Sequence, residues 1–193
     1  MKPPVTSSRL LFFAAVIGIA LNHTYSQAAD PRNDGTLGAT PFPLLTLNGE
    51  GLRVAEFLFL KFKAYRAKLF VLEKSSDPNV LLESKSPMEL SIEYLRDFDL
   101  KQTKDAWTFQ YRDSEAPKYS GIEEDIESLR ESSKAIRSGD THKFKFLDQK
   151  TEFFINQEKV TEFKRPEFRK SFLHIFLGPK PPTEDLKKGL LGK

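Results

Sequence analysis

The chain has 193 residues, 39% of them hydrophobic, which suits one domain of ordinary size. Its 30 basic and 27 acidic residues nearly balance, so its charge gives no reason to expect a nucleic-acid partner. Cysteine is absent, which excludes disulfides, a thiol nucleophile and a cysteine metal site, and three histidines are too few and too scattered for a metal centre. We therefore expect no metal and no other cofactor.

The first 28 residues are typical of a signal peptide. Lys2 and Arg9 form a short basic region, and residues 10–21 form an apolar core. This core is shorter than the roughly 20 residues that a membrane-spanning helix needs. We expect cleavage after Ala28, with Ala29 as the near alternative, export to the periplasm or the medium, and one domain over residues 29–193. An uncleaved N-terminal anchor is the other alternative. Cleavage would remove two of the 30 basic residues and none of the 27 acidic ones, so 28 would remain against 27.

A long apolar run follows the N-terminal segment. Leu44–Leu47 predicts a short strand, and Asn48-Gly49 is the dipeptide most favoured in a two-residue hairpin turn. Residues 51–72 then predict a long strand that carries Arg53 and Tyr65 among Phe, Leu and Ala. A guanidinium and a phenol in such surroundings could hold the polar end of an otherwise apolar ligand. The alternative is an ordinary core strand whose polar residues face water.

The middle of the chain predicts a short helical turn, a strand and two helices. Residues 88–95 alternate between apolar and polar side chains, as a half-buried strand does. Asp99 is placed to cap a helix that carries Trp107 and Tyr111. Residues 121–137 have apolar side chains at helical spacing and predict a second helix, with Gly139 after its end.

The C-terminal part predicts strands over 142–147, 151–156 and 159–163. Pro166 begins a helix that ends at Gly178, and a short helical turn follows near residues 184–188. Strands, helices, strands and a helix in this order predict an α+β fold.

Five separated segments together resemble the chalcone isomerase superfamily, and in particular its bacterial exported branch. They follow one another in the expected order and span most of the chain after the signal peptide. They are residues 47–53 (LNGEGLR), 95–97 (LRD), 136–140 (IRSGD), 166–178 and 185–192 (DLKKGLLG).

The resemblance implies a long, bent antiparallel sheet packed against a layer of helices, an open-faced sandwich with an apolar cleft between the layers. The superfamily's enzymes close a chalcone to a flavanone in this cleft, and its plant fatty-acid-binding members bind fatty acids there. In both branches an arginine on the long strand faces the ligand, and Arg53 matches it. Tyr65 stands where the enzymes have a threonine, and is more similar to the lipid-binding branch. A straight strand would separate Arg53 from Tyr65 by roughly 40 Å, so the resemblance implies that the run bends or folds back.

Three hypotheses follow. The first is a non-catalytic protein that binds a fatty acid or a similar small apolar carboxylate through Arg53 and Tyr65. The second is an intramolecular lyase of the chalcone isomerase type, which closes a phenolic enone to a cyclic ether. The third is an envelope protein in which bulky side chains fill the cleft. Near-balanced charge and the lack of an exposed basic amphipathic helix argue against stable insertion into a membrane.

Overall fold

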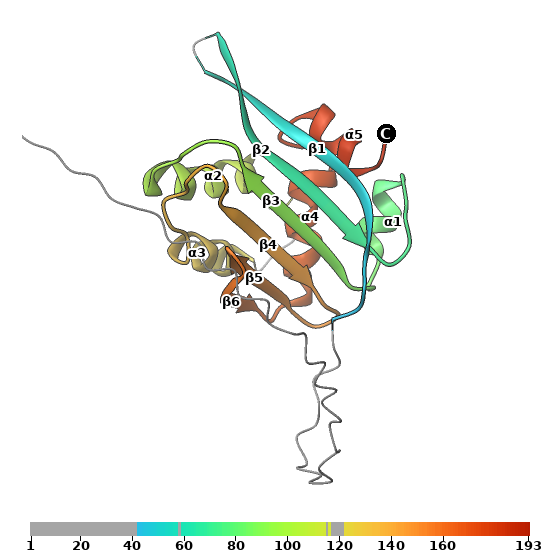
Figure 1. Ribbon diagram of the computed structural model, residues 1–193. Helices are drawn as coiled ribbons and strands as arrows, with labels where there is room; N and C mark the ends of the chain where they lie inside the picture. Colours follow the sequence, from blue (N-terminus) through green and yellow to red (C-terminus); the bar gives the residue numbers. More distant parts are fainter. Residues whose placement is uncertain (1–41, 58, 115, 117–121) are drawn as a thin grey trace, which may run out of the picture. The chain divides into compact units, whose positions relative to one another are not determined.

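The computed structural model describes residues 42–57, 59–114, 116 and 122–193 (Figure 1). The predicted signal peptide lies outside the described residues. None of the described helices is long and apolar enough to cross a membrane. The strands are β1 (Thr46–Phe57), β2 (Leu60–Val71), β3 (Met88–Tyr94), β4 (Thr141–Phe146), β5 (Thr151–Ile155) and β6 (Glu158–Phe163). The helices are α1 (Pro78–Glu83), α2 (Leu100–Asp113), α3 (Glu123–Glu131), α4 (Pro166–Leu177) and α5 (Glu184–Leu190).

The six strands form one antiparallel sheet in sequence order, and the helices lie behind it in Figure 1. Strict alternation along β3 and β4 buries every second side chain against the helices. The opposite face carries ion pairs, such as Arg66 with Glu50 at 3.1 Å and with Glu93 at 3.2 Å. The predicted α+β class, with a sheet against a layer of helices, is confirmed.

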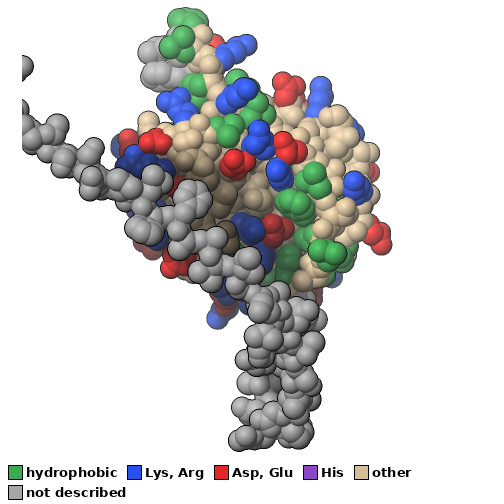
Figure 2. Space-filling model, in the orientation of Figure 1, with side chains coloured by type: hydrophobic (Ala, Val, Ile, Leu, Met, Phe, Trp, Pro, Cys, Tyr) green, Lys and Arg blue, Asp and Glu red, His purple; other side chains and the backbone are tan. Residues whose placement is uncertain are grey.

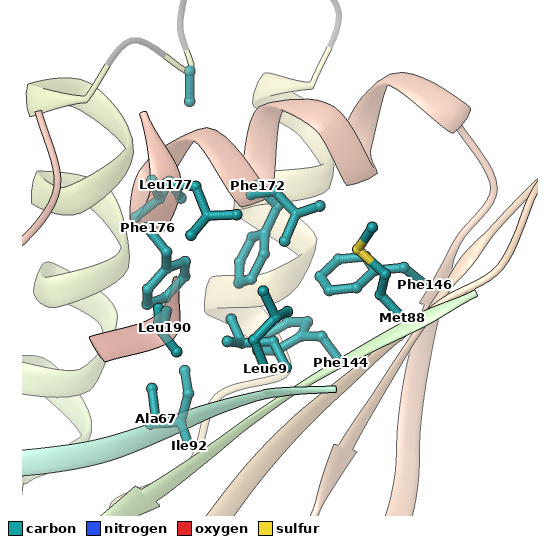
Figure 3. Packing of buried hydrophobic residues seen from close by; sticks show 14 of the residues in the cluster. Ala67, Leu69, Met88, Ile92, Phe144, Phe146, Phe172, Phe176, Leu177 and Leu190 are labelled. Atoms are coloured by element: carbon teal, nitrogen blue, oxygen red, sulfur yellow. The ribbon is translucent and has the colours of Figure 1, made fainter. Parts of the chain in front are cut away.

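Phenylalanine dominates the core between the two layers. Phe144 of β4 and Phe172 of α4 are fully buried, and their ring centroids are 4.2 Å apart. Phe153 of β5 stacks on the other side of Phe144 at 4.7 Å. Figure 3 shows Phe144 and Phe146 on the sheet facing Phe172 and Phe176 on α4. The apolar stripe predicted for the helix that begins at Pro166 therefore packs on the centre of the sheet.

The hairpin turn predicted at Asn48-Gly49 is wrong. Asn48 lies inside β1, at an irregularity in its pairing with β2, and its side chain is buried. Its amide nitrogen donates to the Leu190 carbonyl oxygen at 2.8 Å, and its amide oxygen accepts from the backbone N–H of Ser75 at 2.8 Å. These partners lie far along the chain, so the local turn preference of Asn-Gly is overridden.

The predicted single strand over residues 51–72 is also wrong. The chain reverses between Phe57 and Leu60, and the run forms the second half of β1 and then all of β2. The backbone of Phe59 has a φ of 67°. Neither glycine nor proline marks this turn in the sequence, which is why the run predicts one element instead of two.

The helix predicted over residues 121–137 is shorter in the structure. α3 ends at Glu131, where the Ser133 side chain turns back to donate to the Leu129 carbonyl oxygen at 2.8 Å. Ile136 lies beyond the helix and forms an antiparallel bridge with Phe98. The predicted cap of α2 is confirmed, because the Asp99 side chain accepts from the Gln102 backbone in a capping box.

Candidate functional site

The reversal of the apolar run brings the two candidate site residues together. Arg53 of β1 and Tyr65 of β2 are direct cross-strand partners. The register shifts at this point, between Arg53 and Val54. The pairing of β2 with β3 begins at the same place, where Tyr65 is opposite Tyr94. The folding back that the resemblance implies is therefore present, and it places a guanidinium beside a phenol.

A cavity of about 250 Å³ opens beside this pair, between the sheet and α2. Its wall is mostly apolar and combines side chains from the sheet, from α2 and from α4. The lining residues are Arg53, Ala55, Phe62, Ala64, Tyr65, Ile92, Tyr94, Phe98, Gln102, Thr103, Ala106, Trp107, Phe109, Gln110, Ile136 and Phe176.

Three polar atoms of the cavity wall are buried without a hydrogen-bond partner among the described residues. They are the Tyr65 hydroxyl, the Trp107 Nε1–H and the Gln110 Oε1. A buried polar group without a partner costs free energy, so such groups call for a partner that the described residues do not supply. Two donors and one acceptor carried by residues that line an apolar space are suited to the polar end of a small ligand.

Burial keeps Tyr65 protonated. Desolvation raises the pKa of its phenol above the usual range, and the nearby positive charge of Arg53 opposes this shift only in part. The hydroxyl therefore acts as a hydrogen-bond donor at neutral pH.

Arg53 lies at the border of the cavity and is half-buried. Its Nη1 donates to the Val54 carbonyl oxygen at 2.7 Å, and it forms no ion pair within the described part of the chain. A second hollow of about 320 Å³, lined partly by Lys180 and Pro181, also borders Arg53. The guanidinium thus stands between an apolar interior and a more polar opening.

Sequence reasoning missed Trp107 and Gln110 as site residues. Trp107 counted only as part of the apolar stripe of its helix, and it is indeed buried. The two residues are three positions apart, so both face the same side of α2. The indole N–H was the signal within the sequence, because a buried tryptophan usually needs an acceptor.

The cavity wall also contains a buried hydrogen bond between Tyr94 and His142. The Tyr94 hydroxyl lies 3.0 Å from His142 Nδ1, and the imidazole packs against the rings of Trp107 and Phe153. Burial lowers the pKa of His142 to about 4, although the charge of Asp140 opposes the shift. The imidazole is therefore neutral at pH 7, and its Nδ1 shares a hydrogen bond with the Tyr94 hydroxyl.

From the buried Tyr94–His142 hydrogen bond we predict that the protein loses stability in mild acid. The folded pKa of His142, about 4, lies below its ordinary value of 6.5, so the folded state resists protonation. The stability contributed by neutral His142 is therefore fully present above pH 6.5. It is lost as the pH drops towards 4, which lowers the free energy of unfolding by about 3 kcal/mol. Urea unfolding at a series of pH values measures this slope. We expect His142→Gln, which retains an acceptor, to flatten it.

Identical slopes in wild-type protein and the His142→Gln variant would show that another group causes the acid sensitivity.

Comparisons with known proteins agree with this fold. The sequence model of the chalcone isomerase-like family matches residues 42–192. Among solved structures, a fatty-acid binding protein of Arabidopsis thaliana is similar, with a TM-score of 0.63 and 15% sequence identity over 79% of this chain and 90% of that chain. No curated protein sequence matches this one significantly.

The fold and the cavity define a class, an α+β protein with a ligand-sized space between its sheet and its helices. Within this class, the chain belongs to the chalcone isomerase-like family, because the family model spans nearly all of the described residues. At 15% identity, the likeness to the plant protein shows the shared fold alone.

Proposed function

We propose that this protein is a non-catalytic binder of a fatty acid or a similar small apolar carboxylate. The observation that carries the proposal is the buried Tyr65 hydroxyl, which has no partner among the described residues and lies directly across from Arg53 at an apolar cavity. The carboxylate pairs with Arg53 and accepts from Tyr65. A hydrogen bond between charged groups is roughly twice as strong as a neutral one, so Arg53 contributes most of the head-group affinity.

The cavity accommodates the apolar part of the ligand. Ala55, Phe62 and Ile92 line it on the sheet side, and Trp107 and Phe176 on the helix side. Its volume of about 250 Å³ is slightly below the roughly 300 to 1,000 Å³ usual for ligand pockets. A chain of medium length therefore fits best, while a longer one extends outwards. The similar plant structure, described as a fatty-acid binding protein, supports the same ligand class.

The N-terminal sequence supports a further part of the proposal, that the protein is exported and acts after removal of residues 1–28. Intact mass measurement of protein purified from cells tests this directly. A mature chain that begins at Ala29 supports export, whereas a chain that retains its first residues in the cytoplasm contradicts it.

The ligand is tested by native mass spectrometry of the purified protein, with extraction of whatever co-purifies and titration with decanoate. We expect one bound carboxylate per chain. Arg53→Ala should weaken decanoate binding roughly 10- to 100-fold, because it removes a charge-assisted hydrogen bond. Tyr65→Phe should weaken it by a smaller factor, since it removes one neutral donor.

Arg66→Ala is the matched control. Arg66 is the neighbour of Tyr65 on β2, but it faces the opposite side of the sheet and pairs with Glu50 and Glu93. Its loss should leave decanoate affinity unchanged. Protein that purifies empty and takes up no decanoate would overturn the binding proposal. The lyase hypothesis would then be tested by cyclisation of a phenolic enone.

A further inference from the structure

The hairpin formed by β1 and β2 extends beyond the rest of the sheet (Figure 1). Pairing of β2 with β3 begins at Tyr65, so among the described residues 54–57 pair only with 60–63, and the hairpin between residues 54 and 64 projects past β3. We call this part the hairpin arm. Two apolar side chains at its end are open to solvent, Phe59 with 93% and Leu60 with 72% of its surface exposed. Figure 2 shows hydrophobic side chains beside Lys and Arg side chains at this projecting end.

Phe59 is an unexpected residue for its position. Its φ of 67° is in the left-handed region, which glycine or asparagine adopts with less strain than a bulky side chain. The exposed ring has little to pack against, so burial does not offset this strain. A strained and exposed aromatic residue at a hairpin tip is better explained by a surface that the ring contacts than by folding.

The charge around the tip indicates which surface this is. Lys61 and Lys63 are exposed on β2, within about 10 Å of the tip along the strand. Arg96, also exposed, places its guanidinium 4.3 Å from the centroid of the Phe62 ring. Glu56 is the single acidic residue of the arm's described part. Apolar tip residues with cations within about 10 Å along the strand match a bilayer with anionic head groups.

The arm also connects its tip to the cavity. Leu60 and Phe62 are two positions apart on β2, so their side chains share one face of the hairpin. Phe62 is the cross-strand partner of Ala55, and both of these residues line the cavity. Lys61 and Lys63 are on the opposite face. The arm's own side chains on this face are therefore apolar from the tip to the cavity, with the Arg96 guanidinium beside Phe62, which suits the passage of an acyl chain that ends in a carboxylate.

We propose that the hairpin arm docks reversibly on an anionic lipid surface through Phe59 and Leu60, and that the cavity exchanges its ligand with that surface along the apolar face of the arm. The exchange step rests on the proposed function, whereas the docking step does not. The contact is peripheral and is consistent with the expectation that the protein does not insert stably into a membrane.

Vesicle flotation of the full mature chain tests the docking. We expect the protein to float with vesicles of phosphatidylcholine mixed with phosphatidylglycerol, and much less with phosphatidylcholine alone. The double variant Phe59→Gly with Leu60→Ser should bind roughly tenfold or more weakly, because it removes the inserted apolar area. Phe59→Gly also relieves the strained φ, so the variant folds. Replacing Lys61 and Lys63 by glutamine should weaken binding about fivefold per lysine at low salt.

Val80→Ser is the matched control, because Val80 of α1 is another exposed apolar residue, with 56% of its surface open. It should float as the wild-type protein does. Equal flotation of wild-type protein and the Phe59 and Leu60 double variant would overturn the docking proposal. Wild-type protein that does not bind anionic vesicles would overturn it as well. If the wild-type protein is a dimer, the double variant is a monomer and neither binds vesicles, the tip is instead an interface between two copies of the chain.

The ligand exchange has its own readout. Uptake of a pyrene-labelled fatty acid from anionic vesicles should be slower in the double variant, while equilibrium binding of dissolved decanoate stays at the wild-type value. Equal uptake rates would overturn the exchange step. Vesicle binding that depends on Phe59, in a protein that takes up no fatty acid, would support the docking surface and contradict the proposed function.

Discussion

Replacing Gly51 by alanine is expected to destabilise the protein by more than about 4 kcal/mol, enough to prevent stable folding. β1 and α5 approach each other here through their backbones. A Cβ on Gly51 would lie 2.3 Å from the Leu186 carbonyl oxygen, and one on Gly189 would lie 2.3 Å from the Glu50 carbonyl oxygen. Neither contact can be relieved by rotating a side chain, so α5 would have to leave the sheet.

Urea unfolding followed by far-ultraviolet circular dichroism measures this loss, and limited proteolysis shows whether the C-terminal helix has detached. Gly139→Ala is the control, since nothing lies within 4 Å of a Cβ at that position. Its positive φ of 93° costs only about 1 kcal/mol when alanine is introduced. A Gly51→Ala protein as stable as the Gly139→Ala protein would show that α5 does not pack on β1 this closely.

Phe172→Ala is expected to cost about 3 to 5 kcal/mol in the free energy of unfolding. The side chain is fully buried at the centre of the core, and its ring lies 4.2 Å from Phe144, 5.3 Å from Phe168 and 5.7 Å from Trp107, measured between centroids. Its removal leaves a cavity that these rings can close only in part. Because Trp107 lines the ligand cavity, decanoate affinity should fall as well.

Phe172→Leu keeps part of the buried side-chain volume, so it should lower the free energy of unfolding clearly less than Phe172→Ala does. Phe109→Ala is the control for the residue type, since 49% of the Phe109 side chain is exposed and its loss should change unfolding by less than about 1 kcal/mol. The shift of the urea midpoint measures all three variants. Equal midpoints for Phe172→Ala and Phe109→Ala would contradict the assignment of Phe172 to the centre of the core.

Local signals were sufficient for most elements of the fold. The alternation over residues 88–95 predicted β3, and Asp99 predicted the start of α2, because side-chain periodicity and capping act within a few residues. Pro166 likewise marked the start of α4. The helix predicted to reach residue 137 ended early, because Ile136 pairs with Phe98 on a different element.

The candidate site was predicted only in part. The resemblance to the family indicated Arg53 and Tyr65, and the structure makes them cross-strand partners. The resemblance also implied a cleft between the layers, but the buried polar atoms of Trp107 and Gln110 could not be predicted, because burial without a partner depends on every neighbour at once.

The α+β class, the family and most element boundaries could be predicted without coordinates, because each depends on short-range patterns or on an ordered set of motifs. The position at which the long apolar run reverses depends instead on tertiary contacts. Asn48 has the local preference of a turn residue, but its side chain binds the backbone at Leu190, 142 positions further along the chain. The turn forms instead at Phe59, and that choice brings Arg53 and Tyr65 to one cavity. A contact between residues so distant in sequence leaves no local pattern from which the turn could be predicted.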